Sequence, residues 1–198
     1  MPPDSGSPKE LPDISHHLAE ELRRQRKLRG WSLDQAAQAS GVSKAMLGQI
    51  ERGESSPTVA TLWKIASGFD CSLSRFIAAP TAQEPLPLFR NARSVRAKPA
   101  TDDMLVAPLF PFEAAMGFEL LELTLLPGYV RESEAHANGV IEHVTVLRGA
   151  LDVLIKGQWH PLAEGHAVRF AADLPHGYRN LHDVPAVCHN LIHYPAMP

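Results

Sequence analysis

The sequence predicts two domains of different class, an all-α domain followed by an all-β domain. The length of 198 residues suits two small domains, and 44% hydrophobic residues suffice to build a core. The spacing of apolar residues is helical to about residue 78 and then changes to short alternating runs. The charge changes at the same place. Residues 1–80 hold ten Lys and Arg against nine acids, whereas residues 81–198 hold nine against thirteen and contain eight of the ten histidines. Domains with different tasks are expected.

The helical domain is expected over residues 14–79, after a polar, proline-rich tail at residues 1–13 that is predicted to be disordered. Capping signals delimit five helices. The first extends from about His17 to Arg29 and stops at Gly30. The other four begin at the Ser32–Gln35 capping box, at Ser43, at Pro57–Thr58 and at the short segment SLSRFI.

The second and third helices have the arrangement of a helix-turn-helix, whose second helix enters the major groove of DNA. They are separated by the Gly41–Val42 turn. Helical periodicity divides the third helix into two faces. The apolar face is formed by Met46, Leu47 and Ile50, and the opposite face by Ala45, Gly48, Gln49 and Arg52.

Lys44 and Gln49 are the predicted base readers, because an ammonium reaches guanine acceptors and an amide pairs bidentately with adenine. Gln35 and Arg52 are placed for phosphates. Gly48 costs ~1 kcal/mol relative to Ala in a helix interior, so its small size is expected to serve close approach to a base. The alternative is that these are solvated residues of an ordinary surface helix. The predicted DNA-binding residues are Gln35, Ser43, Lys44, Ala45, Gly48, Gln49 and Arg52.

The segment WSLDQAAQASGVSKAMLGQIERGESSPTVATLWKIA resembles the Xre, or lambda-repressor-like, helix-turn-helix family, and the resemblance covers about residues 16–78. It implies a five-helix domain that binds operator DNA as a dimer. It also implies a structural role for Glu51, and roles facing outward for Ser43, Lys44, Gln49 and Arg52. Gln25 and Gly68 depart from the apolar or Ala-like residues usual in the family, which bears on stability more than on function.

Residues 80–100, rich in proline and arginine, are predicted to form a linker with an edge segment. The second domain, residues 101–198, contains short β-type runs punctuated by glycines. These runs are MLVAPLF, FELLELTLL, IEHVTVLRG, ALDVLIKG, HAVRF and AVCHNLIHY. Their rhythm predicts an antiparallel sandwich or barrel.

Glu142 falls on the apolar face of one such run, between valines at every second position. A buried carboxylate is costly unless it is paired, hydrogen-bonded or coordinated. One hypothesis is a site for one divalent metal (Zn, Mn, Fe or Ni), formed by His136, Glu142 and His176, since nitrogen and oxygen donors suit these ions. The other is a metal-free pocket in which Glu142 and His176 bond each other or a polar effector. Tyr178 and Asn180 are candidates for contacting a ligand, although Tyr178 equally suits packing.

The order Glu142 and Gly149, then Gly165, His176 and Asn180, resembles the two motifs of the cupin barrel over residues 104–194. The resemblance implies a double-stranded β-helix, or jelly-roll, with a site in its interior. The sequence has Glu134 in place of the family's first ligand histidine, and Glu134 is itself a candidate oxygen ligand. The fusion with the helical domain resembles the cupin-bearing branch of Xre-type regulators, in which the barrel is a sensor.

These resemblances imply a sequence-specific transcriptional regulator, not an enzyme, that binds double-stranded operator DNA as a homodimer and responds to a small-molecule effector. Two alternatives stay open. One is a metal-dependent cupin enzyme of dioxygenase or isomerase type fused to a DNA-binding domain, and the other is a constitutive DNA-binding protein whose barrel only dimerises.

Sequence features also bear on location. The longest apolar runs are far shorter than the ~20 residues that a membrane span requires. The N-terminal residues lack the basic-then-apolar pattern of a signal peptide. The two cysteines, Cys71 and Cys188, form no CxxC pattern and fit a reducing compartment. A cytoplasmic protein without a membrane partner is expected.

Overall fold

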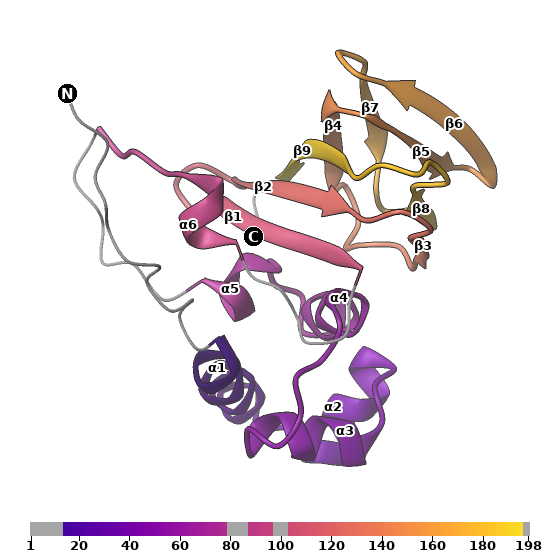
Figure 1. The fold of residues 1–198 in the computed structure, drawn as a ribbon. Coiled ribbons are helices and arrows are strands. Elements are labelled where there is room, and N and C mark those ends of the chain that lie inside the picture. Colours follow the sequence, from indigo (N-terminus) through magenta and orange to yellow (C-terminus); the bar gives the residue numbers. More distant parts are fainter. Residues whose placement is uncertain (1–13, 79–86, 97–102, 196–198) are drawn as a thin grey trace.

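Five helices form the N-terminal domain of the computed structural model, which describes residues 14–78, 87–96 and 103–195 (Figure 1). They are α1 (Ile14–Leu28), α2 (Leu33–Ser40), α3 (Lys44–Glu51), α4 (Val59–Gly68) and α5 (Ser74–Ile77). The five-helix prediction is confirmed, and α1 begins three residues before the expected start. The predicted tail at residues 1–13 lies outside the described residues.

The capping residues identified in the sequence begin the helices that they were expected to begin. Ser32 and Gln35 form the reciprocal capping box of α2. Ser43 Oγ accepts the Met46 N–H at the start of α3, and Thr58 caps α4 in the same way. The turn between α2 and α3 requires Gly41, whose φ of 67° lies in the left-handed region. Local chemistry therefore fixes the helix-turn-helix.

The C-terminal domain consists of two antiparallel sheets that face each other. One contains β1 (Met104–Glu113), β2 (Phe118–Leu125), β9 (Ala186–His193), β4 (Ile141–Arg148) and β7 (Ala167–Ala171), in that order. The other contains β3 (Val130–Ser133), β8 (His176–Arg179), β5 (Ala150–Ile155) and β6 (Gln158–Ala163). The inward residues Val140, Val144 and Val146 are buried, and so is Glu142. The β-barrel prediction is confirmed.

Strands β3, β6 and β8 were not among the expected runs, because none has an apolar face of its own. β3 and β6 are largely exposed, and β8 has the sequence HGYR. Gly177 in β8 shows why this strand depends on its neighbour: a Cβ there would lie 2.4 Å from the carbonyl oxygen of Arg131 in β3. Close pairing with β3 therefore excludes a side chain at this position.

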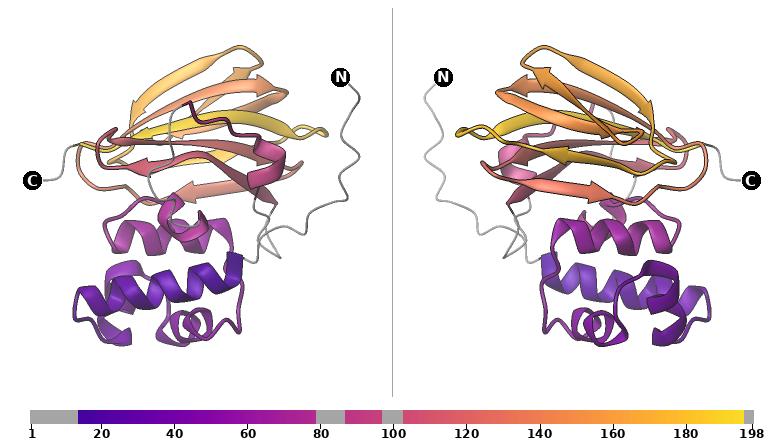
Figure 2. Two further views of the ribbon diagram at one scale, coloured as in Figure 1. Left: turned by 90° about the vertical axis from the view of Figure 1, so that its left-hand side faces the viewer. Right: turned by 90° about the vertical axis from the view of Figure 1, so that its right-hand side faces the viewer.

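The two domains are in contact, and α4 and α5 form the layer that faces the barrel (Figure 2). Glu119 of β2 is fully buried and accepts hydrogen bonds from the N–H groups of Ser74 (2.9 Å) and Leu73 (3.3 Å), at the start of α5. The Tyr194 hydroxyl also donates to Glu119, at 2.5 Å. In the other direction, Ser74 Oγ accepts the Phe112 N–H at 2.9 Å. The side chain of Glu119 in the barrel thus accepts backbone N–H groups at the start of α5 in the helical domain.

One further helix, α6 (Ala92–Val95), lies in the middle of the predicted linker. It packs against β1, and Arg96 next to it forms an ion pair with Glu122 of β2 at 2.5 Å. The described part of the 80–100 stretch is therefore attached to the barrel. The flanking residues 79–86 and 97–102 lie outside the described chain.

Candidate functional site

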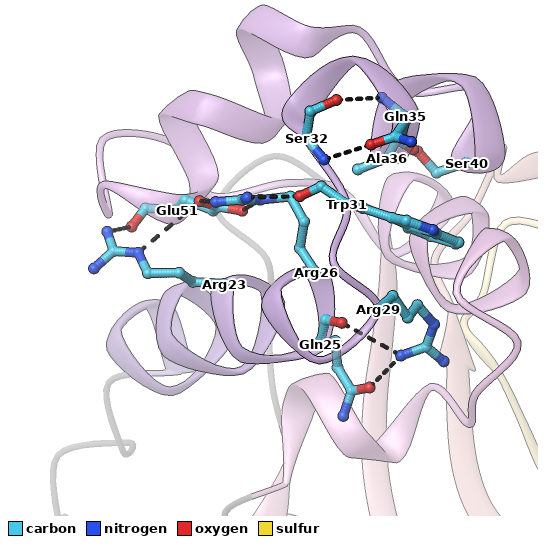
Figure 3. A network of polar contacts seen from close by, with 10 residues as sticks. All are labelled: Arg23, Gln25, Arg26, Arg29, Trp31, Ser32, Gln35, Ala36, Ser40 and Glu51. Atoms are coloured by element: carbon cyan, nitrogen blue, oxygen red, sulfur yellow. Dashed lines mark hydrogen bonds and ion pairs between the residues drawn. The ribbon is translucent and has the colours of Figure 1, made fainter.

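The helix expected to read DNA, α3, is held against α1 by a buried ion pair (Figure 3). Glu51 at the end of α3 receives two hydrogen bonds from Arg26, of 2.6 and 2.7 Å, in a bidentate arrangement. Arg23 donates to the backbone carbonyl of Glu51 at 2.6 Å, and Arg26 also donates to the carbonyl of Trp31 at 3.0 Å. The structural role that the family resemblance implied for Glu51 is present.

The outer face of α3 is accessible. Lys44, Ala45 and Gln49 are exposed there, as are Ser43 and Arg52 at the two ends of the helix. Two of the cations hold surface acids: Lys44 Nζ lies 2.8 Å from Asp34, and Arg52 donates to Glu54 at 2.8 and 2.7 Å. Exposed pairs contribute little to stability, so both cations can exchange these partners for a phosphate or a base. Gln35 is exposed beside them, with its Oε1 engaged in the capping box.

Gly48 is the exception, and its assignment to the outer face is wrong. It is buried, and a Cβ at this position would lie 3.2 Å from Nη1 of Arg52 and 3.8 Å from Cδ1 of Leu33. The Arg52 side chain folds back over the helix and the start of α2 closes the other side. The small size of Gly48 therefore makes room for protein side chains.

Inside the barrel, Glu142 of β4 is 1% exposed and fully hydrogen-bonded. His136 Nε2 lies 2.9 Å from Oε1, and His176 Nε2 lies 3.5 Å from the same oxygen. The Tyr178 hydroxyl donates to Oε2, and Asn190 Nδ2 donates to Oε2 at 3.0 Å. Two strands (β8 and β9), and the loop between β3 and β4, thus supply partners for one buried carboxylate.

The charge of Glu142 is stabilised by the two histidines. Burial alone would raise the pKa of Glu142, but the hydrogen bonds from His136 and His176 outweigh it and hold the pKa well below its usual range. Burial acts to lower the pKa of His176, and its hydrogen bond to Glu142 reverses this and leaves the pKa raised. Burial and the adjacent Glu142 carboxylate raise the pKa of Tyr178 well above its usual value, so that its hydroxyl stays a donor. The guanidinium of Arg131 also interacts electrostatically with the Glu142 carboxylate.

The same three groups fit a divalent metal. One ligand atom each of His136, Glu142 and His176 lies within 4.8 Å of the others. The outer nitrogens have partners that direct the Nε2 atoms inward, with His176 Nδ1 2.9 Å from the Leu174 carbonyl and His136 Nδ1 3.4 Å from Ser67 Oγ. Two imidazoles and one carboxylate are a donor set used by Zn and non-haem Fe. Such an ion would add positive charge next to the Glu142 carboxylate.

Two of the sequence-based assignments in the barrel need correction. Glu134 is exposed, lines the cavity beside α2 and α4, and is not part of the cluster that His136 and His176 form with Glu142. Asn180 is buried, but its side chain is committed to the backbone: Nδ2 donates to the carbonyls of Leu125 (3.0 Å) and Val184 (2.8 Å), and Oδ1 accepts the His182 N–H. Asn180 therefore closes the loop between β8 and β9 and does not face the site.

Asn190 belongs to the site and was missed. Its Oδ1 is buried and has no hydrogen-bond partner among the described residues, whereas its Nδ2 is held by Glu142. The signal was present in the sequence, because Asn190 alternates with Cys188 and Ile192, which are fully buried on the same face of β9. A polar residue at a core position is the feature that singled out Glu142. The free acceptor is suited to a donor on a bound ligand.

The barrel site borders the helical domain. The His136 ring packs on Trp63 of α4 with centroids 4.9 Å apart, and Ser67, one turn further along α4, is its Nδ1 partner. The guanidinium of Arg131 in β3 also lies over the Trp63 ring, 5.5 Å from its centroid. A candidate metal ligand is thus in direct contact with the DNA-binding domain.

Known proteins resemble the chain in both halves. Residues 22–76 match the helix-turn-helix family, and residues 121–192 match the cupin domain family. The HTH-type transcriptional regulator SutR of Escherichia coli (strain K12) is 45% identical over 185 residues, which cover 93% of this chain and 99% of SutR. The HTH-type transcriptional regulator PuuR of the same organism is 28% identical over 163 residues, with 81% and 84% covered.

The solved structures agree with these relatives. The crystal structure of an HTH_3 family transcriptional regulator from Vibrio cholerae matches with a TM-score of 0.78 and 47% identity, over 92% of this chain and 97% of that chain.

Across the described residues, every helix is too short or too polar to cross a membrane.

Proposed function

Since the chain belongs to the family of Xre-type helix-turn-helix transcriptional regulators that carry a cupin domain, we propose that it binds a specific operator through α3 and that its barrel senses a small molecule. The effector or a divalent metal binds at Glu142 in this proposal. The observation that carries it is the contact between His136, a member of the buried site, and Trp63 and Ser67 of α4. A change at the site acts directly on a helix of the DNA-binding domain.

The DNA-binding part of the proposal rests on exposure and chemistry. Lys44 and Gln49 project from one side of a helix whose other side is anchored through Glu51. Regulators of this type bind as dimers to two half-sites about 34 Å apart, one turn of DNA. Because that spacing must be matched by two copies of α3, a modest reorientation of the helical domains relative to the barrels changes operator affinity.

The sensing part rests on the polar groups inside the barrel. When a metal is bound, His136, Glu142 and His176 hold it, and it supplies positive charge and open coordination positions for an effector. Tyr178 and Asn190 keep the second oxygen of Glu142 in place. The unpartnered Oδ1 of Asn190 offers an acceptor to the ligand. The apolar surroundings exclude water and strengthen each of these contacts.

Substitutions in α3 test the first part, on an operator selected from random duplexes with the full-length chain. Gln49→Ala should lose ~1–3 kcal/mol of binding free energy on that operator and little on random DNA, as expected of a base reader. Arg52→Ala should weaken both and reduce the salt slope by about one, because a phosphate contact releases one counterion. Gln158→Ala, an exposed glutamine on β6, is the matched control. Equal losses on both DNAs would remove Gln49 from the base readers.

Native mass spectrometry tests the second part, on protein purified without added metal. We expect a bound metal or a retained small molecule in the wild type. His176→Ala should release it while the protein stays folded, whereas His160→Ala, an exposed histidine on β6, should retain it. Glu142→Gln keeps the shape and removes the charge. If this variant binds the same metal and effector as well as the wild type does, Glu142 is only a structural hydrogen-bonding group.

A further inference from the structure

A cavity of about 520 Å³ lies between the helical domain and the barrel, outside the Glu142 site. Its walls come from α1, α4 and the segment that leads into α5 on one side. On the other side they come from β1, the loop between β3 and β4, and the end of β9. Small-molecule sites typically have ~300–1,000 Å³ and are frequent at domain interfaces. The cavity therefore has the size and location of a ligand site.

The polar lining of this cavity is cationic. Three guanidinium groups line it, those of Arg24, Arg29 and Arg75, against one carboxylate, that of Asp70. Burial raises the pKa of Cys71, also in the lining, to about 12, so its thiol adds no negative charge. The excess of positive charge suits an anion.

Two of the three arginines share one carboxylate, that of Glu21, and the third has no acidic partner among the described residues. Glu21 receives two hydrogen bonds of 2.7 Å from Arg24, and its Oε1 lies 3.6 Å from Nη1 of Arg75. Within the described part of the chain, Arg29 donates to neutral acceptors only, which are the Oε1 and carbonyl of Gln25 and the carbonyl of Phe69. Gln25 thus orients Arg29 while leaving its charge unpaired, a role visible in Figure 3. The guanidinium of Arg29, directly after α1, therefore keeps a positive charge that can pair with a ligand.

The remaining walls are apolar. Leu28, which is 68% exposed, stands at the α1 side, and Trp63 and Ala66 line the α4 side. Val140 and Phe112 close the cavity from the barrel. Burial of such surfaces by a ligand contributes about 25 cal/mol per Å². An occupant with both a charged head and an apolar body satisfies the two parts of the lining at once.

We propose that this interdomain cavity binds an organic anion with an apolar body, and that it is a second ligand site, separate from the barrel interior. The anionic head lies at Arg29 and Arg75 and the apolar body on Trp63. His136 lines the cavity and also contacts Glu142, so it separates the two sites.

Two fluorescent probes that differ by one charge test the proposal. 8-Anilinonaphthalene-1-sulfonate carries a sulfonate, and N-phenyl-1-naphthylamine has the same rings without it. We expect one molecule of the sulfonate probe to bind per chain, more tightly than the neutral probe. Arg75→Met should weaken binding of the sulfonate probe about tenfold and leave binding of the neutral probe unchanged. A tenfold loss corresponds to the lower end of the free energies found for hydrogen bonds to charged groups. Arg148→Met, an exposed arginine at the end of β4, should leave both unchanged.

A second variant changes a residue on the barrel side of the same cavity. Asn138→Trp places a large side chain in the cavity from an exposed loop position, and should abolish the binding of both probes. Unaltered sulfonate binding in Asn138→Trp would overturn the proposal, and so would equal losses for Arg75→Met and Arg148→Met. The titrations need neither operator nor metal, so their failure is distinguishable from a failure of the proposed regulatory function.

Discussion

Replacing Glu51 with Gln tests whether a buried ion pair holds the recognition helix in place. The side chain of Glu51 is 7% exposed and that of Arg26 is 17% exposed, and two short hydrogen bonds join them. Removing one partner of a buried pair typically costs ~3–5 kcal/mol, because the other charge is left uncompensated. Arg26 keeps some exposure and its bond to the Trp31 carbonyl, so we expect the free energy of unfolding of the helical domain to fall by about 2–4 kcal/mol.

The chain contains a matched control a few residues away. Arg52 and Glu54 form hydrogen bonds of nearly the same length, 2.8 and 2.7 Å, but their side chains are 55% and 53% exposed. Water and salt screen such a pair, so Glu54→Gln should leave the free energy of unfolding unchanged within error. Urea unfolding followed by far-ultraviolet circular dichroism, to which the helices contribute most, measures both variants in the full-length chain.

The comparison is decisive because geometry is held nearly constant while burial differs. If Glu51→Gln and Glu54→Gln give the same unfolding midpoint as the wild type, the buried pair does not anchor α3 and the reasoning from burial is refuted. If the helical domain loses stability only in Glu51→Gln, the anchoring of α3 to α1 is confirmed. Operator binding by this variant should then weaken as well, because α3 loses its fixed orientation.

Two further predictions concern pH. Burial raises the pKa of Glu119, against the hydrogen bonds from Ser74, Tyr194 and Leu73, so the folded state favours the neutral acid. The contribution of Glu119 to the free energy of unfolding is therefore fully present below about pH 4 and is lost as the pH rises through the raised pKa. Thermal midpoints of the wild type should fall relative to those of Glu119→Gln over that range. Parallel curves for the two proteins would contradict the direction of the pKa shift. Metal binding at Glu142 requires neutral imidazoles, and the raised pKa of His176 lets protons compete, so retention of metal in dialysis should drop as the pH falls through the histidine range.

Local chemistry made much of this molecule predictable. The N-cap residues and the left-handed glycines set the helix ends within a few residues, because each depends on neighbours in the chain. Strict alternation identified the buried face of β4 and placed Glu142 on it, since a strand repeats every two residues. The histidine partners were predicted from their spacing, from ligand chemistry and from the resemblance to the cupin motifs, and the structure brings His136 and His176 to Glu142.

The errors lie where a side chain is committed by tertiary contacts. Gly48 has the periodicity of an exposed position, and the side chains of Arg52 and Leu33 cover it. Asn180 has the motif spacing of a site residue, but its side-chain amide is hydrogen-bonded to backbone groups of β2 and of the loop between β8 and β9. Glu134 is only two residues from His136, which contacts Glu142, and its side chain is nevertheless exposed. Sequence spacing cannot distinguish these cases, because it contains no information on which surface another segment covers.

The interface between the domains was also beyond the sequence, and it connects the barrel to the helix-turn-helix by few steps. Ser67 of α4 is 69 residues from His136, its partner in the barrel. The next residue, Gly68, packs so closely on α2 that a Cβ would lie 2.4 Å from Cα of Ser40. Ser40 ends α2, immediately before the turn into α3. In the proposed regulatory mechanism, a ligand that displaces His136 would push on α4 next to Gly68, where α4 and α2 are closely packed. Packed elements respond to such a push by moving together, which carries the recognition helix with them.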